Sequence, residues 1–233
     1  MKKSWILILL TCIILLGLGY FLWPLAFTVV PIEQVEAVKQ SEAFDAVSYV
    51  DGIWSGRIIP TLTEKAVDLS LILNKVNVDP NGKVSKEVLI PIAKEYGLIT
   101  VGEAHVYAVK GEGEILAVDT SKSAGVAEVK LDGYEGPIRI YLYIGPSIPN
   151  DETSIRDGVG FINFGDFKDQ TQYGKVASEI NKRVINEVLQ PIDKENLQGK
   201  RIKFYGAFTI RTFNLITIDL SRVNIVPIRI DLQ

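Results

Sequence analysis

Cysteine and histidine are almost absent from this 233-residue sequence, which contains one of each, Cys12 and His105. A single cysteine excludes an internal disulfide, and the residues after it have no thiol chemistry. Zinc sites usually draw several ligands from Cys and His, so we expect no metal of that kind and no cofactor. A Ser-His-Asp triad would have to use His105, which lies in a strand-like segment with no serine-elbow motif. The sequence therefore predicts a protein that is not an enzyme, with hydrolase as a remote alternative.

Charge is absent from the first long segment of the chain. Residues 5–23 contain no charged side chain, and a helix of that length is about 28 Å long, close to the ~30 Å core of a bilayer. Lys2 and Lys3 precede this run, so the positive-inside rule leaves the N-terminus in the cytoplasm. The segment predicts a single-pass transmembrane helix in the cytoplasmic membrane, with the C-terminal part extracytoplasmic, in the periplasm.

A lipid anchor at Cys12 is the alternative. Residues 9–12 approach the cleavage pattern of lipoproteins, in which the cysteine becomes the lipidated first residue. Thr11 fits that pattern poorly, because a smaller Gly, Ala or Ser is expected before the cysteine. The apolar run also continues eleven residues past Cys12, further than a lipid anchor needs. Both alternatives place the rest of the chain in the same compartment.

The exported part has an excess of acidic residues. Lys2 and Lys3 are the only charged residues in 1–31, so the remainder carries 23 basic and 28 acidic residues, a net charge of −5. This balance argues against nucleic acid and anionic lipid as partners. Basic and aromatic residues do alternate on some predicted strands, and cross-strand pairing explains them better than nucleic-acid binding does. These residues are Arg139, Tyr141, Tyr143, Arg201, Lys203, Tyr205 and Arg211.

Residues 41–97 show a helical period, with apolar side chains three and four positions apart. The expected boundaries are a cap at Ser41, breaks at Gly56 and Pro60, a capping box over residues 61–64, a cap at Ser85 and a stop at Gly97 in the C′ position.

After Gly97 the period changes to two, which is typical of strands. The expected elements are strands over 103–110 and 114–119 joined by a hairpin at 111–113, strands over 126–132 and 139–144, a helix over 170–189 capped by Asp169, a strand over 201–211, and a strand over 222–232 with a bulge near Val226 and Pro227. The fold class is therefore mainly β with helices (α+β). Strands, a helix and more strands indicate a doubled architecture of oligonucleotide/oligosaccharide-binding (OB) barrels.

The order and spacing of several short motifs resemble a known family over about residues 40–230. The motifs are 44–46 with Ile53-Trp54, Pro60 with 65–69, 144–146, Arg156-Asp157, 161–167, Gln170, Gly199-Lys200 and 206–208. The family comprises bacterial periplasmic lipoproteins of unknown function, often encoded beside ribose-type sugar ABC transporters. The resemblance implies tandem OB-like barrels and no established activity. This chain departs from the family at Thr11-Cys12 and at Asp169-Gln170, where many members have Asn-Gln.

Three regions follow from these predictions. We expect an N-terminal membrane anchor or signal over 1–31, a helical segment with a first OB-like barrel over 32–148, and a second OB-like barrel with the long helix over 149–233.

The segment from Ile155 to Val184 combines charge, glycine and aromatic residues more densely than any other. Its ligand-binding candidates are Arg156, Asp157, Asn163, Asp166 and Gln170. A guanidinium and a carboxylate can bind a sugar or a carboxylate, and amides suit sugar hydroxyls. The same residues can instead form an internal ion pair and caps that hold irregular backbone. Both interpretations remain open at this point.

The expected function is that of a non-enzymatic, membrane-anchored extracytoplasmic accessory protein. The resemblance implies a sugar ABC transporter or its solute-binding protein as the partner. The alternative is a stand-alone OB-fold module that binds a small molecule or a glycan.

Overall fold

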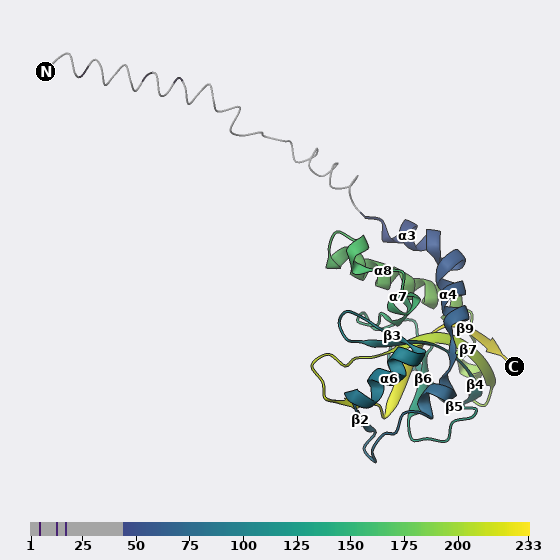
Figure 1. Ribbon diagram of the computed structural model, residues 1–233. Helices are drawn as coiled ribbons and strands as arrows, with labels where there is room; N and C mark the ends of the chain where they lie inside the picture. The colour runs from purple at the N-terminus through teal and green to yellow at the C-terminus, as the bar shows by residue number, and fades with distance from the viewer. Residues whose placement is uncertain (1–4, 6–12, 14–16, 18–43) are drawn as a thin grey trace. The chain divides into compact units, whose positions relative to one another are not determined.

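The computed structural model describes residues 5, 13, 17 and 44–233 (Figure 1). Residues Asp45–Gln233 form one compact unit. Almost all of the predicted anchor over 1–31, including Cys12, and the predicted cap at Ser41 lie outside the described residues. Within the described part of the chain, no helix is both long and apolar enough to cross a membrane.

The compact unit alternates short helices with strands. Its helical elements are α3 (Ala46–Ile53), η1 (Trp54–Ile58), α4 (Ile59–Lys65), α5 (Leu69–Leu73), α6 (Lys86–Tyr96), α7 (Ser154–Val159), η2 (Phe164–Asp166), α8 (Gln170–Arg183), η3 (Val184–Leu189) and η4 (Lys194–Asn196). Its strands are β1 (Val67–Asp68), β2 (Lys83–Ser85), β3 (Leu98–Ile99), β4 (His105–Asp119), β5 (Val126–Leu131), β6 (Arg139–Tyr143), β7 (Arg201–Ile210), β8 (Thr217–Asp219) and β9 (Arg222–Leu232).

Five strands pair in a ring. The hydrogen-bonded order is β4–β5–β6–β9–β7, and β7 also pairs with β4. All these pairings are antiparallel except that of β6 with β9. Helices α7 and α8 connect β6 to β7, which are the third and fourth strands of the ring in chain order. Five strands in a Greek-key order are the arrangement of an OB barrel.

The expectation of two tandem barrels is corrected by this ring. Strands from both expected barrels belong to one sheet, because β6 of the first pairs with β9 of the second and β4 pairs with β7. Strand pairing across a long helical connection leaves no local signal in the sequence. The strands, helix and strands that suggested a doubled fold are a single barrel with helices inserted between its third and fourth strands.

The hairpin expected at residues 111–113 is also wrong, since β4 runs unbroken through it. A Cβ on Gly111 would lie 2.7 Å from the Phe204 ring, and one on Gly113 would lie 2.2 Å from the Lys130 carbonyl oxygen. Neighbouring strands therefore approach β4 where it has no side chains. The two glycines permit close packing rather than a turn.

The breaks expected at Gly56 and Pro60 are absent, because α3, η1 and α4 follow one another as one helical run. In η1 the Ile59 N–H donates to the Trp54 carbonyl, five residues back. A π-helical turn displaces the regular hydrogen bonds, so Pro60 fits near the start of α4 without its own N–H. The capping box expected over 61–64 is wrong for the same reason, since these residues lie inside α4.

Other boundaries agree with the sequence. Asp169 caps α8, and its carboxylate accepts from the Gln172 N–H at 2.9 Å. Ser85 is the N-cap residue of α6, which ends at Gly97. The bulge in β9 is confirmed beside Pro227, where the register with β7 shifts between Tyr205 and Gly206. Gly97 differs from expectation in being extended, and a Cβ there would lie 2.6 Å from the Val106 carbonyl oxygen.

The main core lies inside the ring of strands, where Tyr107 and Phe208 stack with their ring centroids 5.0 Å apart. Figure 1 shows α7 and α8 gathered with α3 on one side of the strands, away from α6. The Trp54 indole N–H donates to Glu187 at 2.6 Å and joins η1 to η3. Helices α4 and α7 pack against β4 and β7, and α8 packs against α7 and α3. The predicted site lies among these helices.

Candidate functional site

The predicted site segment begins with the short helix α7, which contains Arg156 and Asp157. The helix ends at Gly160, which is left-handed (φ 74°) and whose N–H donates to the Asp157 carbonyl. Glycine adopts this conformation without the strain that a Cβ causes. The chain then passes through η2 to α8, so both ends of the segment lie on helices.

Arg156 and Asp157 form a buried ion pair. The Arg156 Nε–H donates to Asp157 Oδ1 at 2.8 Å, and an Nη1–H donates to the Tyr173 carbonyl at 3.2 Å. The guanidinium also lies over the Tyr173 ring, 3.6 Å from its centroid. Asp157 accepts from the Tyr173 hydroxyl at 3.1 Å and from the Thr153 hydroxyl at 2.7 Å.

This network joins α7 to α8. Burial, with the Asp157 charge beside it, raises the pKa of the Tyr173 hydroxyl to about 12, so Tyr173 remains a hydrogen-bond donor at neutral pH. Asp157 accepts from three donors, while Arg156 donates to two acceptors and lies over the Tyr173 ring. The contacts are those of an internal ion pair, one of the two interpretations left open by the sequence.

Asn163 and Asp166 stabilise the turn at η2. They form a reciprocal capping box, in which the Asn163 side chain accepts from a backbone N–H and Asp166 accepts from the Asn163 N–H at 3.1 Å. Gln170 is the first residue of α8. Arg156, Asp157, Asn163 and Gln170 line one groove, and Asp166 supports its edge without lining it.

We call this feature the Arg156 groove; its cavity volume is about 750 Å³. One wall comes from α7, η2 and α8, and the other from residues 98–102. The second wall was not predicted, because the pairing of Leu98 with Val106 brings it there. In the sequence, only the apolar residues of this segment could have indicated that it forms part of a site. The apolar side chains exposed along the groove are Leu98 (37%), Ile99 (42%), Val101 (106%) and Phe164 (55%).

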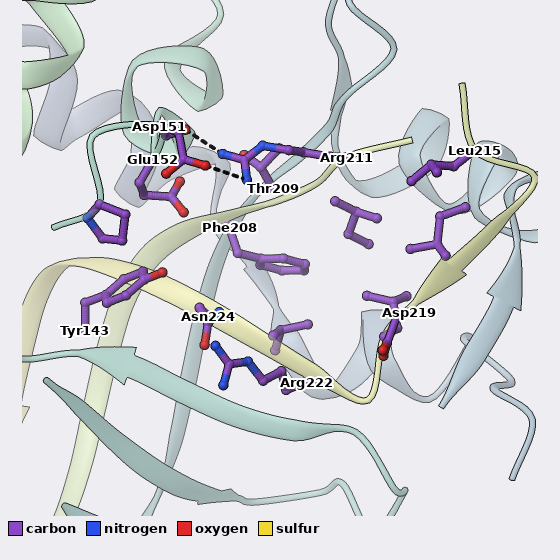
Figure 2. A pocket seen from close by; sticks show the side chains of 15 residues that line it. Tyr143, Asp151, Glu152, Phe208, Thr209, Arg211, Leu215, Asp219, Arg222 and Asn224 are labelled. Atoms are coloured by element: carbon purple, nitrogen blue, oxygen red, sulfur yellow. Dashed lines mark hydrogen bonds and ion pairs between the residues drawn. The ribbon is translucent and has the colours of Figure 1, made fainter. Parts of the chain in front are cut away.

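A second cavity, which the sequence analysis did not predict, lies where β6, β7 and β9 meet (Figure 2). We call it the barrel-end cavity; its volume is about 400 Å³. It is lined by the end of β6, the connection after it, the end of β7, β8 with its flanking residues, and the start of β9. Its labelled polar side chains are Tyr143, Asp151, Glu152, Thr209, Arg211, Asp219, Arg222 and Asn224.

Glu152 is the buried carboxyl group of this cavity. Burial raises its pKa above the ordinary value, although hydrogen bonds from the Ser154 hydroxyl and N–H act in the opposite direction. Beside it, Arg211 forms an ion pair with Asp151 at 3.2 Å. Tyr143, one of the alternating basic and aromatic residues, is buried against this connection, and burial raises its pKa to about 12.

The remaining members of the predicted basic-aromatic face pair with neighbours. Lys203 binds Glu112 at 2.8 Å, and Arg201 binds Asp132 at 2.5 Å. Arg139 lies over the Tyr141 ring, 5.8 Å from its centroid. The Lys203–Glu112 pair is the cross-strand contact expected from the alternation, whereas Arg139 and Tyr141 lie on the same strand.

His105 lies on a strand as predicted and is fully buried. Burial lowers the pKa of its imidazole, and its Nδ1 has no hydrogen-bond partner among the described residues. In the same part of the chain, no group of three His, Cys, Asp or Glu side chains is arranged to hold a metal ion.

Comparison with known proteins supports the fold and assigns a family. The chain is similar to an OB-fold protein from Thermotoga maritima, whose crystal structure matches with a TM-score of 0.60 and 20% identity, over 82% of this chain and 99% of that one. No curated protein matches the sequence. Residues 14–231 match the family described as predicted periplasmic lipoprotein (DUF2291). The chain therefore belongs to this family of predicted periplasmic lipoproteins.

Proposed function

We propose that the protein is a non-enzymatic accessory protein that works outside the cytoplasm by binding a partner protein at the Arg156 groove. The observation that carries this proposal is the exposure of Leu98, Ile99, Val101 and Phe164 around one groove. Contiguous exposed apolar side chains are costly in water and often mark interaction sites.

The groove combines an apolar rim with a fixed polar floor. The Arg156–Asp157 pair is held by Tyr173 and Thr153, so it orders the floor before any partner arrives. A preordered surface loses less conformational entropy on binding.

We propose a sugar ABC transporter, through its solute-binding protein, as the partner. This choice rests on the resemblance to a family encoded beside such transporters, together with the assignment to predicted periplasmic lipoproteins. In this proposal the N-terminal segment attaches the protein to the membrane, and residues 45–233 present the groove to the solute-binding protein.

Biolayer interferometry of the detergent-purified full chain against a sugar-transporter solute-binding protein from the same organism tests this proposal. Val101→Glu places a charge on the exposed rim and should weaken binding about tenfold or more, since a desolvated unpaired charge is costly. Val88→Glu is the matched control, because Val88 is exposed on α6 and does not line the groove. Absence of binding, or equal loss in both variants, would contradict the proposal.

A further inference from the structure

The barrel-end cavity contains polar groups whose hydrogen bonds are not made within the protein (Figure 2). Asn224 Oδ1 is buried and has no hydrogen-bond partner in the described part of the chain. Buried acceptors are nearly always paired, because an unpaired one costs free energy. Asn224 lines a cavity large enough for a small ligand, so rotation of its amide toward the cavity would let a ligand group supply the missing donor.

Donors face the same space. The Tyr143 hydroxyl points into the cavity in Figure 2, and its raised pKa of about 12 keeps it protonated. The Arg222 guanidinium has no ion-pair partner among the described residues and lies 5.6 Å from the Tyr141 ring centroid. Donors and an acceptor are therefore available together to one occupant.

The charges around the cavity are mixed. Arg211 is neutralised by Asp151, while Glu152 and Asp219 oppose the positive charge of Arg222. A strongly anionic ligand would meet these carboxyl groups, and a strongly cationic one would meet the two arginines. The lining thus favours an uncharged ligand over an ion.

Between the polar groups the lining is apolar. It includes the buried side chains of Phe208, Ile218, Leu220 and Val223. Such a surface suits the carbon skeleton of a ligand, while the surrounding polar groups orient it.

We propose that the barrel-end cavity binds a small uncharged molecule with several hydroxyl groups. A hydroxyl both donates and accepts hydrogen bonds, so adjacent hydroxyls can serve Asn224 Oδ1, Tyr143 and Arg222 together. The volume of about 400 Å³ accommodates a molecule of the size of a monosaccharide or cyclitol. This site is separate from the Arg156 groove, with no lining residue in common, and does not depend on the proposed function.

Isothermal titration calorimetry of the full chain with glucose, mannitol and myo-inositol tests the ligand class. A polyoxyethylene detergent is used because a sugar-based detergent would compete for the site. We expect saturable binding of at least one of the three with a Kd of about 1 mM or below, and weaker or no binding of citrate and spermidine. No binding of any of the three, or tighter binding of citrate or spermidine, overturns the proposal.

Two variants locate the binding. Asn224→Leu should weaken it about tenfold or more and leave the melting temperature unchanged or higher, since it removes an unpaired acceptor. Tyr143→Phe removes one donor and should weaken binding about two- to tenfold. Tyr141→Phe is the matched control on the same strand, outside the cavity. Unchanged affinity in both cavity variants, or equal loss in the control, would place the ligand elsewhere and overturn the site.

Discussion

At the scale of single residues, Asp157 shows how the predicted site serves the fold. Its carboxylate accepts from Arg156, Thr153 and Tyr173, and it joins two helices that the sequence alone does not bring together. The Arg156–Asp157 pair was predictable as a local cluster of charge. Its partner Tyr173 was not, because the contact depends on the packing of α7 against α8.

Asp157→Ala should lower the free energy of unfolding by about 3–5 kcal/mol, because it leaves the buried Arg156 guanidinium without its partner. The double variant Arg156→Leu/Asp157→Leu should recover part of that loss, since no unpaired charge remains. Chemical denaturation of the full chain measures both. Glu112→Ala is the control: its pair with Lys203 is exposed and should matter little. Unchanged unfolding in Asp157→Ala would contradict the structural role.

We expect the stability of the protein to depend on pH through the buried carboxyl group of Glu152. Its folded-state pKa is raised above the ordinary 4.5 by burial, so its contribution to stability is full below that value and is lost as pH rises through the folded-state pKa. Glu152→Gln does not titrate, and its amide oxygen can still accept from the Ser154 N–H. The melting temperature of the variant minus that of the wild type should therefore increase from acidic to neutral pH. A difference that is constant or decreases with pH would contradict this.

At the scale of elements, the periodicity of apolar residues predicted most helices and strands, but several of the predicted boundaries were wrong. Asp169 and the apolar residues four apart in α8 identified that helix, because both signals are local. The hairpin at 111–113 failed because a glycine pair in an alternating sequence signals either a turn or a close approach of strands. Only the positions of β5 and β7 beside β4 decide between them.

Gly113→Ala should destabilise the protein by roughly 1–3 kcal/mol or more, since overpacking a tightly packed sheet forces the backbone apart. Its Cβ would lie 2.2 Å from the Lys130 carbonyl oxygen. Gly174→Ala is the matched control, because no atom other than the adjacent backbone of α8 lies within 4 Å of that Cβ. Alanine there should stabilise the helix by about 1 kcal/mol. Thermal melts of both variants check the pair. Equal changes in melting temperature in the two variants would contradict the close approach of β5 to β4 at Gly113.

At the scale of the whole molecule, topology separates what was predictable from what was not. The sequence indicated OB-type strands and an exported domain, and the similar OB-fold structure and the family assignment agree. It did not reveal that β6 pairs with β9 and β4 with β7, so one barrel was interpreted as two. The same long-range pairing places residues 98–102 opposite α7. The wall of the Arg156 groove formed by residues 98–102 could therefore not be predicted from the sequence.

Hydrogen–deuterium exchange of the full chain, with and without the solute-binding protein, tests the proposed function most directly. If the partner covers the Arg156 groove, amides in residues 98–102 and 160–173 should exchange more slowly in the complex. The two stretches are 58 residues apart in sequence at their nearest ends, Gly102 and Gly160, and both line the groove, so joint protection has no local explanation. Amides of α6 around Val88 should be unchanged. Protection absent from both stretches, or confined to residues outside them, would contradict the account.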